Sequence, residues 1–244
     1  MIETSSLSLQ STRGRPSTRG RLDTGRTAKG SQTRDRILES ALLLFRDQGY
    51  EQTTMRAVAR DAGVALGNTY YYFESKEHLL LAFYERLHQE HLAAALPLLD
   101  RERDLKKRVR GVIAAKIDAS EPYHRFSQLL FKTAGDPRSP LNPFSRESAV
   151  ARRQSIGLFD SVVAGSIKKI PEDLRGELPY LLWLYHMGIV LYWIHDESEE
   201  RAKTYRLLDT TVDLVIRVVT LSGLPGLGAL RRRAVAMIKD LRPA

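Results

Sequence analysis

Residues 53–76, TTMRAVARDAGVALGNTYYYFESK, decide how this chain folds, because they are typical of two short helices joined by a glycine turn. The first helix has one apolar stripe at helical spacing, formed by Met55, Val58, Ala59 and Ala62. Thr53 is placed to cap its N-terminus. Gly63 follows its C-terminus, where the backbone usually enters the left-handed region that glycine tolerates best. This is the layout of a DNA-reading motif.

The second helix, predicted over residues 65–73, carries Asn68, Thr69 and three consecutive tyrosines. At 3.6 residues per turn, some of these tyrosines must face outward. Their hydroxyls can donate to phosphates, their rings can pack on sugars or thymine methyls, and Asn68 can pair with adenine. The alternative is that the rings half-bury against neighbouring helices, as aromatic runs often do. Ser75 is placed to cap a third, longer helix.

With the helix before it, this stretch resembles the helix-turn-helix domain of the TetR family of transcriptional regulators. The matching residues form a glycine turn, a small-residue helix start, an aromatic series and a Ser-Lys pair: Gly63, Val64, Gly67, Tyr70, Tyr72, Phe73, Ser75 and Lys76. Two positions depart from the family pattern. Thr69 stands where an inward-packing apolar residue is usual, and Leu66 stands where relatives are often polar, which suggests that Leu66 packs on a thymine methyl.

The resemblance and the absence of any strand pattern both predict an all-α protein. The resemblance further implies that an N-terminal three-helix helix-turn-helix domain precedes a larger helical domain for ligand binding and dimerisation. Ten residues are expected at the DNA: Thr53, Thr54, Arg56, Leu66, Gly67, Asn68, Tyr70, Tyr71, Tyr72 and Lys76. Those expected to hold phosphates are Thr53, Thr54, Tyr70, Tyr72 and Lys76. Those expected to face bases are Leu66, Asn68 and Tyr71.

Composition narrows the classes of partner. The 244 residues carry a formal net charge of +9, which favours a polyanion but does not separate nucleic acid from an anionic membrane. The sequence has no cysteine, which excludes disulfides, thiol catalysis and thiolate metal sites and is compatible with a reducing cytoplasm. The first thirty residues lack the apolar segment of a signal peptide, so we expect a cytoplasmic protein.

Four parts are predicted along the chain. Residues 1–30, rich in Ser, Thr, Gly and Arg, are expected to form a disordered basic arm. This arm either enters the minor groove, lies along phosphates or is a solubilising tail. Residues 31–77 form the helix-turn-helix domain, whose first helix, predicted over 33–48, is scaffold. Residues 78–224 form the helical ligand-binding and dimerisation domain, and residues 225–244 form a C-terminal helical extension.

The helix that begins at Lys76 is expected to end near Pro97 and to act as the lever between the two domains. On this helix His88 and His91 are three residues apart, but no third ligand at metal-binding spacing joins them, so no metal site is expected. The following helix has an outer face of Lys106, Lys107, Arg108 and Arg110. Such a face is usually solvated, and contact with nucleic acid or lipid is the alternative.

Residues 180–194 are apolar on nearly every side, yet too short to span a bilayer, which needs about twenty residues. A helix of this kind has to be buried all round. By resemblance to the TetR family, the helices near 179–195 and 198–221 are expected to pair with their copies in a homodimer. The alternative is that they form a monomeric core.

The same resemblance places a pocket for a small-molecule effector between the middle helices. Its candidate walls are Phe83, Leu87, Ile113, Phe126, Leu130, Phe131, Phe159 and Trp183. Apolar residues at helical spacing more often form plain core, which is the alternative for each of them. A pocket with these walls predicts an apolar or aromatic effector.

No catalytic motif emerges. Gly226 and Gly228 lack the third glycine of a dinucleotide fingerprint, and Ser166 and Lys169 have Ser-x-x-Lys spacing without its partner motifs. We therefore expect no enzyme activity and no cofactor. The predicted function is a repressor released from a palindromic double-stranded DNA operator by an effector. The alternatives are a constitutive DNA-binding regulator with a filled C-terminal domain, and a helical scaffold that binds proteins or membranes.

Overall fold

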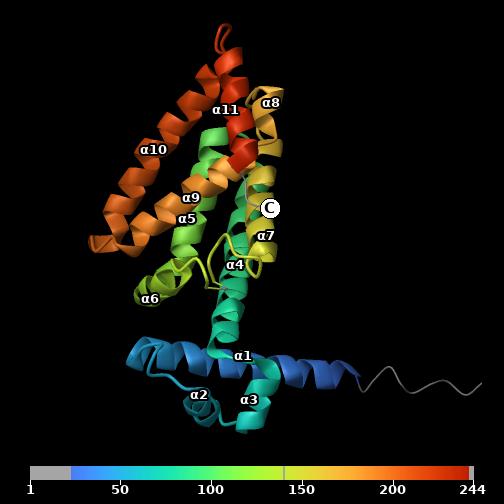
Figure 1. Ribbon diagram of the computed structural model, residues 1–244, viewed down its shortest axis with the longest axis vertical. Coiled ribbons are helices and arrows are strands. Elements are labelled where there is room, and N and C mark those ends of the chain that lie inside the picture. Colours follow the sequence, from blue (N-terminus) through green and yellow to red (C-terminus); the bar gives the residue numbers. More distant parts are fainter. Residues whose placement is uncertain (1–22, 140, 242–244) are drawn as a thin grey trace, which may run out of the picture.

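The computed structural model describes residues 23–139 and 141–241, and every regular element in these ranges is a helix (Figure 1). The predicted all-α class is therefore confirmed. No helix in the described ranges has both the length and the apolar character needed to cross a bilayer. Most of the predicted basic arm lies outside the described residues.

Three helices form the lower part of the molecule in Figure 1: α1 (Asp23–Gln48), α2 (Met55–Asp61) and α3 (Leu66–Tyr72). They enclose a core in which Ile37, Phe45 and Val58 are almost fully buried. Helix α1 begins ten residues earlier than predicted, so the expectation that residues 23–30 belong to a disordered arm is wrong.

Helix α4 (Lys76–Arg101) rises from the lower part into the upper one (Figure 1). The prediction that it ends near Pro97 is wrong, because the helix continues through this proline. Proline has no N–H, so Pro97 cannot donate to the Ala93 carbonyl as another residue at this position would. Pro97 and Ala93 are both exposed, so water can bond to the Ala93 carbonyl instead. Leu99 is buried beyond the proline, and its packing holds the last turn in place.

The upper part of the molecule is built from the remaining helices: α5 (Leu105–Ser120), η2 (Glu121–Tyr123), α6 (His124–Ala134), α7 (Ala149–Ala164), α8 (Glu172–Arg175), α9 (Leu178–Ile194), η3 (Glu199–Arg201), α10 (Ala202–Leu221) and α11 (Gly228–Leu241). The apolar side of α5 is buried, through residues such as Val109, Val112 and Ile117. Ser145 and Ser148 bond to each other before α7 begins, and Gly165 caps its end.

The prediction that Arg108 lies on a solvated face is wrong, because the residue is only 2% exposed. Its guanidinium donates to the carbonyls of Leu99 and Glu102 at the end of α4, and to those of Ser161 and Val162 at the end of α7. Carbonyls at helix C-termini have no partner within their own helix, so Arg108 satisfies groups that would otherwise be buried unpaired. Burial lowers the pKa of Arg108 from its ordinary value.

The other basic residues of this face of α5 are paired within the chain. Lys106 and Arg110 bond to Asp213 and Asp209 of α10, at 2.9 and 2.7 Å. Lys107 lies 3.7 Å from Glu102. This face therefore joins α5 to α10 and to the end of α4. Because Lys106, Lys107 and Arg110 are paired within the chain, the face is less suited to the alternative of binding nucleic acid or lipid.

Gly165 lies against the Arg108 guanidinium, and this contact can be tested. A Cβ added at Gly165 would lie 2.2 Å from Nη2 of Arg108, a distance that real atoms do not adopt. We expect Gly165→Ala to displace the guanidinium and lower stability by about 1–3 kcal/mol. Thermal unfolding followed by circular dichroism measures this loss.

Gly157→Ala in the same helix is the matched control, because no atom lies within 4 Å of a Cβ added there. Alanine in a helix interior stabilises by about 0.5–1 kcal/mol relative to glycine, so this variant should melt at or above the wild-type temperature. Equal melting temperatures for the two variants would contradict the role given to Arg108.

Candidate nucleic-acid interface

The turn between α2 and α3 has the backbone that the sequence predicts. Gly63 has a φ of +63°, in the left-handed region, and Val64 N donates to Ala59 O at 3.0 Å. The cap of α2 is Thr54, whose hydroxyl oxygen accepts from Ala57 N at 3.1 Å. The prediction that Thr53 caps this helix is therefore wrong by one residue.

Thr53 is also unsuited to the phosphate contact predicted for it. Its side chain is 1% exposed, and its hydroxyl donates to Gly49 O at 2.8 Å while accepting from the Gln48 side chain. Thr54 is exposed, and its hydroxyl proton stays available because the capping bond uses only the oxygen. Of the two threonines, only Thr54 faces a potential partner.

Helix α3 has a buried back and an exposed front. Thr69 is fully buried, while Leu66 and Tyr72 are half-buried and pack on the lower core. The front presents Gly67, Asn68, Tyr70 and Tyr71, and the Tyr71 side chain is 81% exposed. The prediction that some tyrosines face outward is confirmed for Tyr70 and Tyr71, whereas Tyr72 follows the half-buried alternative.

Lys76 is held inside the domain. Its ammonium donates to Tyr50 O at 2.8 Å and lies 4.4 Å from the centre of the Tyr50 ring. The Tyr50 hydroxyl in turn donates to Glu77 at 2.9 Å, and burial together with this carboxylate raises the pKa of Tyr50. The structure thus corrects the phosphate role predicted for Lys76, because its ammonium fastens the loop before α2 to the first turn of α4.

Two arginines on α2 add positive charge beside the front of α3. Arg56, which the sequence predicts at the DNA, is exposed. Arg60, one helical turn further, is exposed as well and was not predicted. The i, i+4 spacing of the two arginines opposite the apolar stripe is the signal that identifies it.

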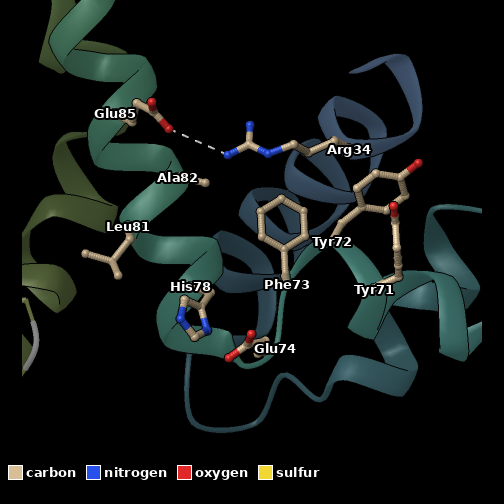
Figure 2. Close-up of a pocket in the computed structure, with 9 residues that line it drawn as sticks. All are labelled: Arg34, Tyr71, Tyr72, Phe73, Glu74, His78, Leu81, Ala82 and Glu85. Carbon is tan, nitrogen blue, oxygen red and sulfur yellow. Dashed lines mark ion pairs between the residues drawn. The ribbon is translucent and has the colours of Figure 1, made fainter. Parts of the chain in front are cut away.

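A surface pocket of about 290 Å³ lies behind this interface, between α1, the end of α3 and the first turns of α4 (Figure 2). Arg34 crosses it, with Nη2 3.6 Å from Glu85 Oε2 and the guanidinium carbon 5.2 Å from the centre of the Phe73 ring. A second pocket of about 340 Å³ lies at the end of α9, lined by Tyr192, His195, Asp196, Glu197, Ser198 and Lys203.

The structure does not gather the eight predicted effector-pocket residues around one space. Phe83, Leu87, Phe126 and Leu130 belong to the lower core. Ile113, Phe159 and Trp183 belong to the upper core, against which Phe131 is half-buried. Neither pocket described above is lined by any of the eight.

A polar cluster interrupts the upper core instead. It consists of His88 and His91 from α4, Lys116 from α5 and His186 from α9. The His91 and His186 rings are 6.1 Å apart. Within the described ranges, however, no three histidine or acidic side chains form a group that could hold a metal.

A glycine turn between two short helices, with the second helix presenting polar and aromatic side chains outward, defines a helix-turn-helix protein. A family model described as "Bacterial regulatory proteins, tetR family" matches residues 37–83. A second, described as "Tetracyclin repressor-like, C-terminal domain", matches residues 108–232, which is just over half of the chain. This chain belongs to the TetR family.

Individual relatives match mainly through the N-terminal part. The transcriptional repressor KstR of Rhodococcus jostii is 51% identical over 51 residues, which are 21% of this chain and 24% of the repressor. KstR2 of Mycolicibacterium smegmatis is 29% identical over 97 residues, which are 40% of this chain and 46% of that protein. The chain thus spans less than half the length of the curated relatives it matches.

Solved structures share the whole architecture at low sequence identity. A TetR transcriptional regulator from Nitrosomonas europaea superposes with a TM-score of 0.57 at 18% identity, covering 74% of this chain and 96% of that one. FadR from Bacillus subtilis, solved in complex with stearoyl-CoA, superposes with a TM-score of 0.57 at 16% identity, covering 73% and 95%. These superpositions show the fold.

The back of α3 can be tested through Thr69, whose buried hydroxyl has no hydrogen-bond partner among the described residues. Replacing it by a methyl group removes an unsatisfied polar atom without changing the shape of the side chain. We expect Thr69→Val to stabilise the domain by about 1 kcal/mol, measured as an increase in melting temperature.

Thr53→Val is the matched control, because the Thr53 hydroxyl is equally buried but hydrogen-bonded. This substitution leaves Gly49 O without its donor and should lower stability by about 1–2 kcal/mol. If both variants shift the melting temperature in the same direction, the assignment of the unpaired hydroxyl is wrong.

Proposed function

We propose that this protein is a homodimeric transcriptional repressor that binds a palindromic operator through α3 and leaves it when a small-molecule effector binds the upper domain. The observation that carries the proposal is the exposed front of α3, with Asn68, Tyr70 and Tyr71 held outward by a buried back. The proposed action needs neither catalysis nor a cofactor. It takes place in the cytoplasm, where the chromosomal operator lies.

The exposed residues divide by the chemistry that they offer to a duplex. Asn68 can pair with adenine and Tyr71 can pack on a base edge in the major groove. Thr54, Arg56 and Tyr70 can donate to phosphates, and we add Arg60 to this group. A Cβ added at Gly67 would lie in open space, so the fold of the protein does not require glycine at this position. The place of Gly67 on the front of α3 suits a close approach of DNA.

A dimer is supported by the apolar surface of α9 and α10. Six large apolar side chains on these helices are exposed: Leu184, Leu191, Tyr192, Leu214, Val218 and Leu221. Helices α9 and α10 pack against each other, and several large apolar side chains exposed on such a pair suit an interaction surface. Pairing with a second copy would bury it and set two α3 helices side by side, at the spacing of about 34 Å that separates successive major grooves.

Two observations bear on the effector. The curated relatives include repressors, and the FadR structure holds stearoyl-CoA, which supports an effector for a protein of this fold. The dispersal of the eight predicted wall residues over two cores favours the alternative of a constitutive regulator with a filled upper domain. We favour the effector-responsive regulator over the constitutive one because of the polar cluster. A core that only fills space would not normally contain imidazoles without hydrogen-bond partners.

Operator selection from genomic fragments, followed by fluorescence anisotropy, tests DNA reading. We expect Asn68→Ala to weaken operator binding by about 1–3 kcal/mol and to leave random DNA unaffected, because the side chain is assigned to a base. Arg56→Ala should weaken both DNAs alike and reduce the salt slope by about 1, because it is assigned to a phosphate.

Arg153→Ala is the matched control, since this exposed arginine lies on α7 in the upper domain and its loss changes the net charge equally. It should leave both affinities unchanged. Weak binding that is blind to sequence in the wild type would favour the scaffold alternative. An Asn68→Ala variant with full operator preference would contradict the assignment of α3.

The dimer surface is tested by charge insertion. Val218 is 66% exposed in the last turn of α10, so an aspartate there is harmless to a monomer but unfavourable in a dry interface. We expect Val218→Asp to convert a dimer into a monomer in size-exclusion chromatography with light scattering.

Ile167→Asp is the control, because Ile167 is 79% exposed and lies outside α9 and α10. This variant should remain dimeric. A monomeric wild type would refute the proposal.

A further inference from the structure

We propose that the effector is an amphiphilic monocarboxylate, whose acidic group binds the cluster formed by the buried His88, His91 and His186 and the half-buried Lys116, and whose apolar body lies among the surrounding core residues. This inference rests on the proposed function, because it gives the chemical class of the effector for the same domain.

The cluster contains buried polar atoms that the protein itself leaves unbonded. His186 is 5% exposed, and neither of its ring nitrogens has a hydrogen-bond partner among the described residues. The same holds for Nε2 of the buried His88. Only His91 is bonded, with Nε2 2.8 Å from Val112 O. Buried polar groups in folded proteins are nearly always paired, so three open nitrogens at one place indicate a missing partner.

The charge of the cluster favours an anion. Lys116 contributes an ammonium with no hydrogen bond or ion pair assigned to it in the described part of the chain, and its charge acts on all three imidazoles. Burial, followed by this charge, holds the pKa of His91 at about 4 and lowers the pKa of His88. Burial also lowers the pKa of His186 well below its ordinary value, followed by the effects of His91 and then Lys116. The one carboxylate whose charge reaches Lys116 is that of Glu90, which is exposed on the outside of α4.

The surroundings of the cluster select among anions. The Phe159 ring lies 5.6 Å from the His186 ring, and both Phe159 and Val112, whose carbonyl oxygen His91 contacts, belong to the upper core. Transfer of a phosphate dianion into such a place would cost far more than transfer of a single carboxylate, and one ammonium balances one negative charge. Imidazole and ammonium donors directed at a carboxylate form charge-assisted hydrogen bonds.

Binding at this place would act on α4 directly. Two of the four polar residues belong to α4, one to α5 and one to α9, so an effector has to enter between these helices and part them. Neither of the two surface pockets reaches the cluster, so the site would open as the effector binds. Displacement of α4 moves the helix-turn-helix domain, because Lys76 ties its first turn to the loop before α2.

The test uses the full chain without DNA, so its outcome does not depend on operator binding. Thermal unfolding is followed with straight-chain carboxylates from hexanoate to hexadecanoate and with phenylbutyrate, each beside the alcohol of the same skeleton. We expect at least one carboxylate to raise the melting temperature by several degrees and its alcohol to leave it unchanged. Isothermal calorimetry with that carboxylate then gives the dissociation constant.

Substitutions locate the acidic group. Lys116→Met should weaken binding of the carboxylate about tenfold or more, because the ammonium is lost from a buried pair. Lys107→Met, on the same helix but outside the cluster, should bind normally. His186→Phe should bind more weakly yet melt at a higher temperature than wild type, because it removes two unpaired nitrogens from the core. A purely structural histidine would not give this opposite pair of changes.

The pH dependence provides a second readout. Burial lowers the pKa of Lys116 to about 8, against the raising effect of Glu90, and the three imidazoles are neutral near pH 7. Carboxylate binding should therefore weaken as the pH rises from 7 to 9 and Lys116 loses its proton. In Lys116→Arg, whose guanidinium stays charged throughout, this decline should be absent.

Three results would overturn the inference. The first is that no carboxylate of the panel raises the melting temperature, and the second is that carboxylate and alcohol bind equally well. The third is that zinc chloride alone stabilises the protein and that this effect is lost in His186→Phe, because the cluster would then be a metal site. In each case specific operator binding would still stand, because it is measured separately. If the protein bound carboxylates but no specific operator, the result would contradict the proposed function as a regulator and would leave the proposed carboxylate site intact.

Discussion

The packing of α4 into two separate cores is the constraint on which the rest of this structure depends. Its first half carries Leu79, Leu80 and Phe83 into the lower core, while Ala95 and Leu99 belong to the upper one. Phe83 lies 5.2 Å from Phe126 of α6, whose ring stacks on Phe45 of α1 at 5.7 Å. The aromatic contact thus joins the helix-turn-helix domain, the lever and the first helices of the upper domain in one packed unit.

The two ends of α4 are held by polar contacts of a different kind. At its start, Lys76 bonds to Tyr50 O, and Tyr50 bonds back to Glu77. At its end, Arg108 binds the carbonyls of Leu99 and Glu102 and ties them to the end of α7. Between these ends lie His88 and His91, with an unbonded nitrogen on His88. In the proposed mechanism, the effector therefore acts on α4 at its middle, where a buried nitrogen lacks a partner, and not at its two fixed ends.

Periodicity in the sequence predicted α2, because an apolar stripe at helical spacing has to be buried. The glycine turn predicted the short helix α3 that follows it and the positive φ of Gly63. Local patterns failed where a residue acts against its usual preference. Arg108 is charged yet buried, because the carbonyls that require it come from residues 99 and 161, far apart in sequence. No local pattern contains that information.

The candidate site shows the same division. Local sequence identified Asn68, Tyr70 and Tyr71 as outward-facing, because a short helix after a glycine turn can bury only one side. It assigned phosphate contacts to Thr53 and Lys76, since threonine and lysine are good donors, but their partners Gly49 and Tyr50 lie in a loop whose path only the fold determines. His186 joined the histidines of α4 through tertiary packing across almost a hundred residues.

The position of Phe73 makes the response of α4 consequential for α3. Phe73 directly follows α3, is almost fully buried and lies under the Arg34 guanidinium, and α4 begins three residues later. A rotation of the first turns of α4 therefore carries α3 with it, because the short connection is anchored in the core and cannot absorb the change. In a symmetric pair of chains, such a rotation alters the distance between two recognition helices twice over. DNA with a fixed helical repeat tolerates little change of that distance, so under the proposed function a small shift in the middle of α4 would separate the bound and unbound populations.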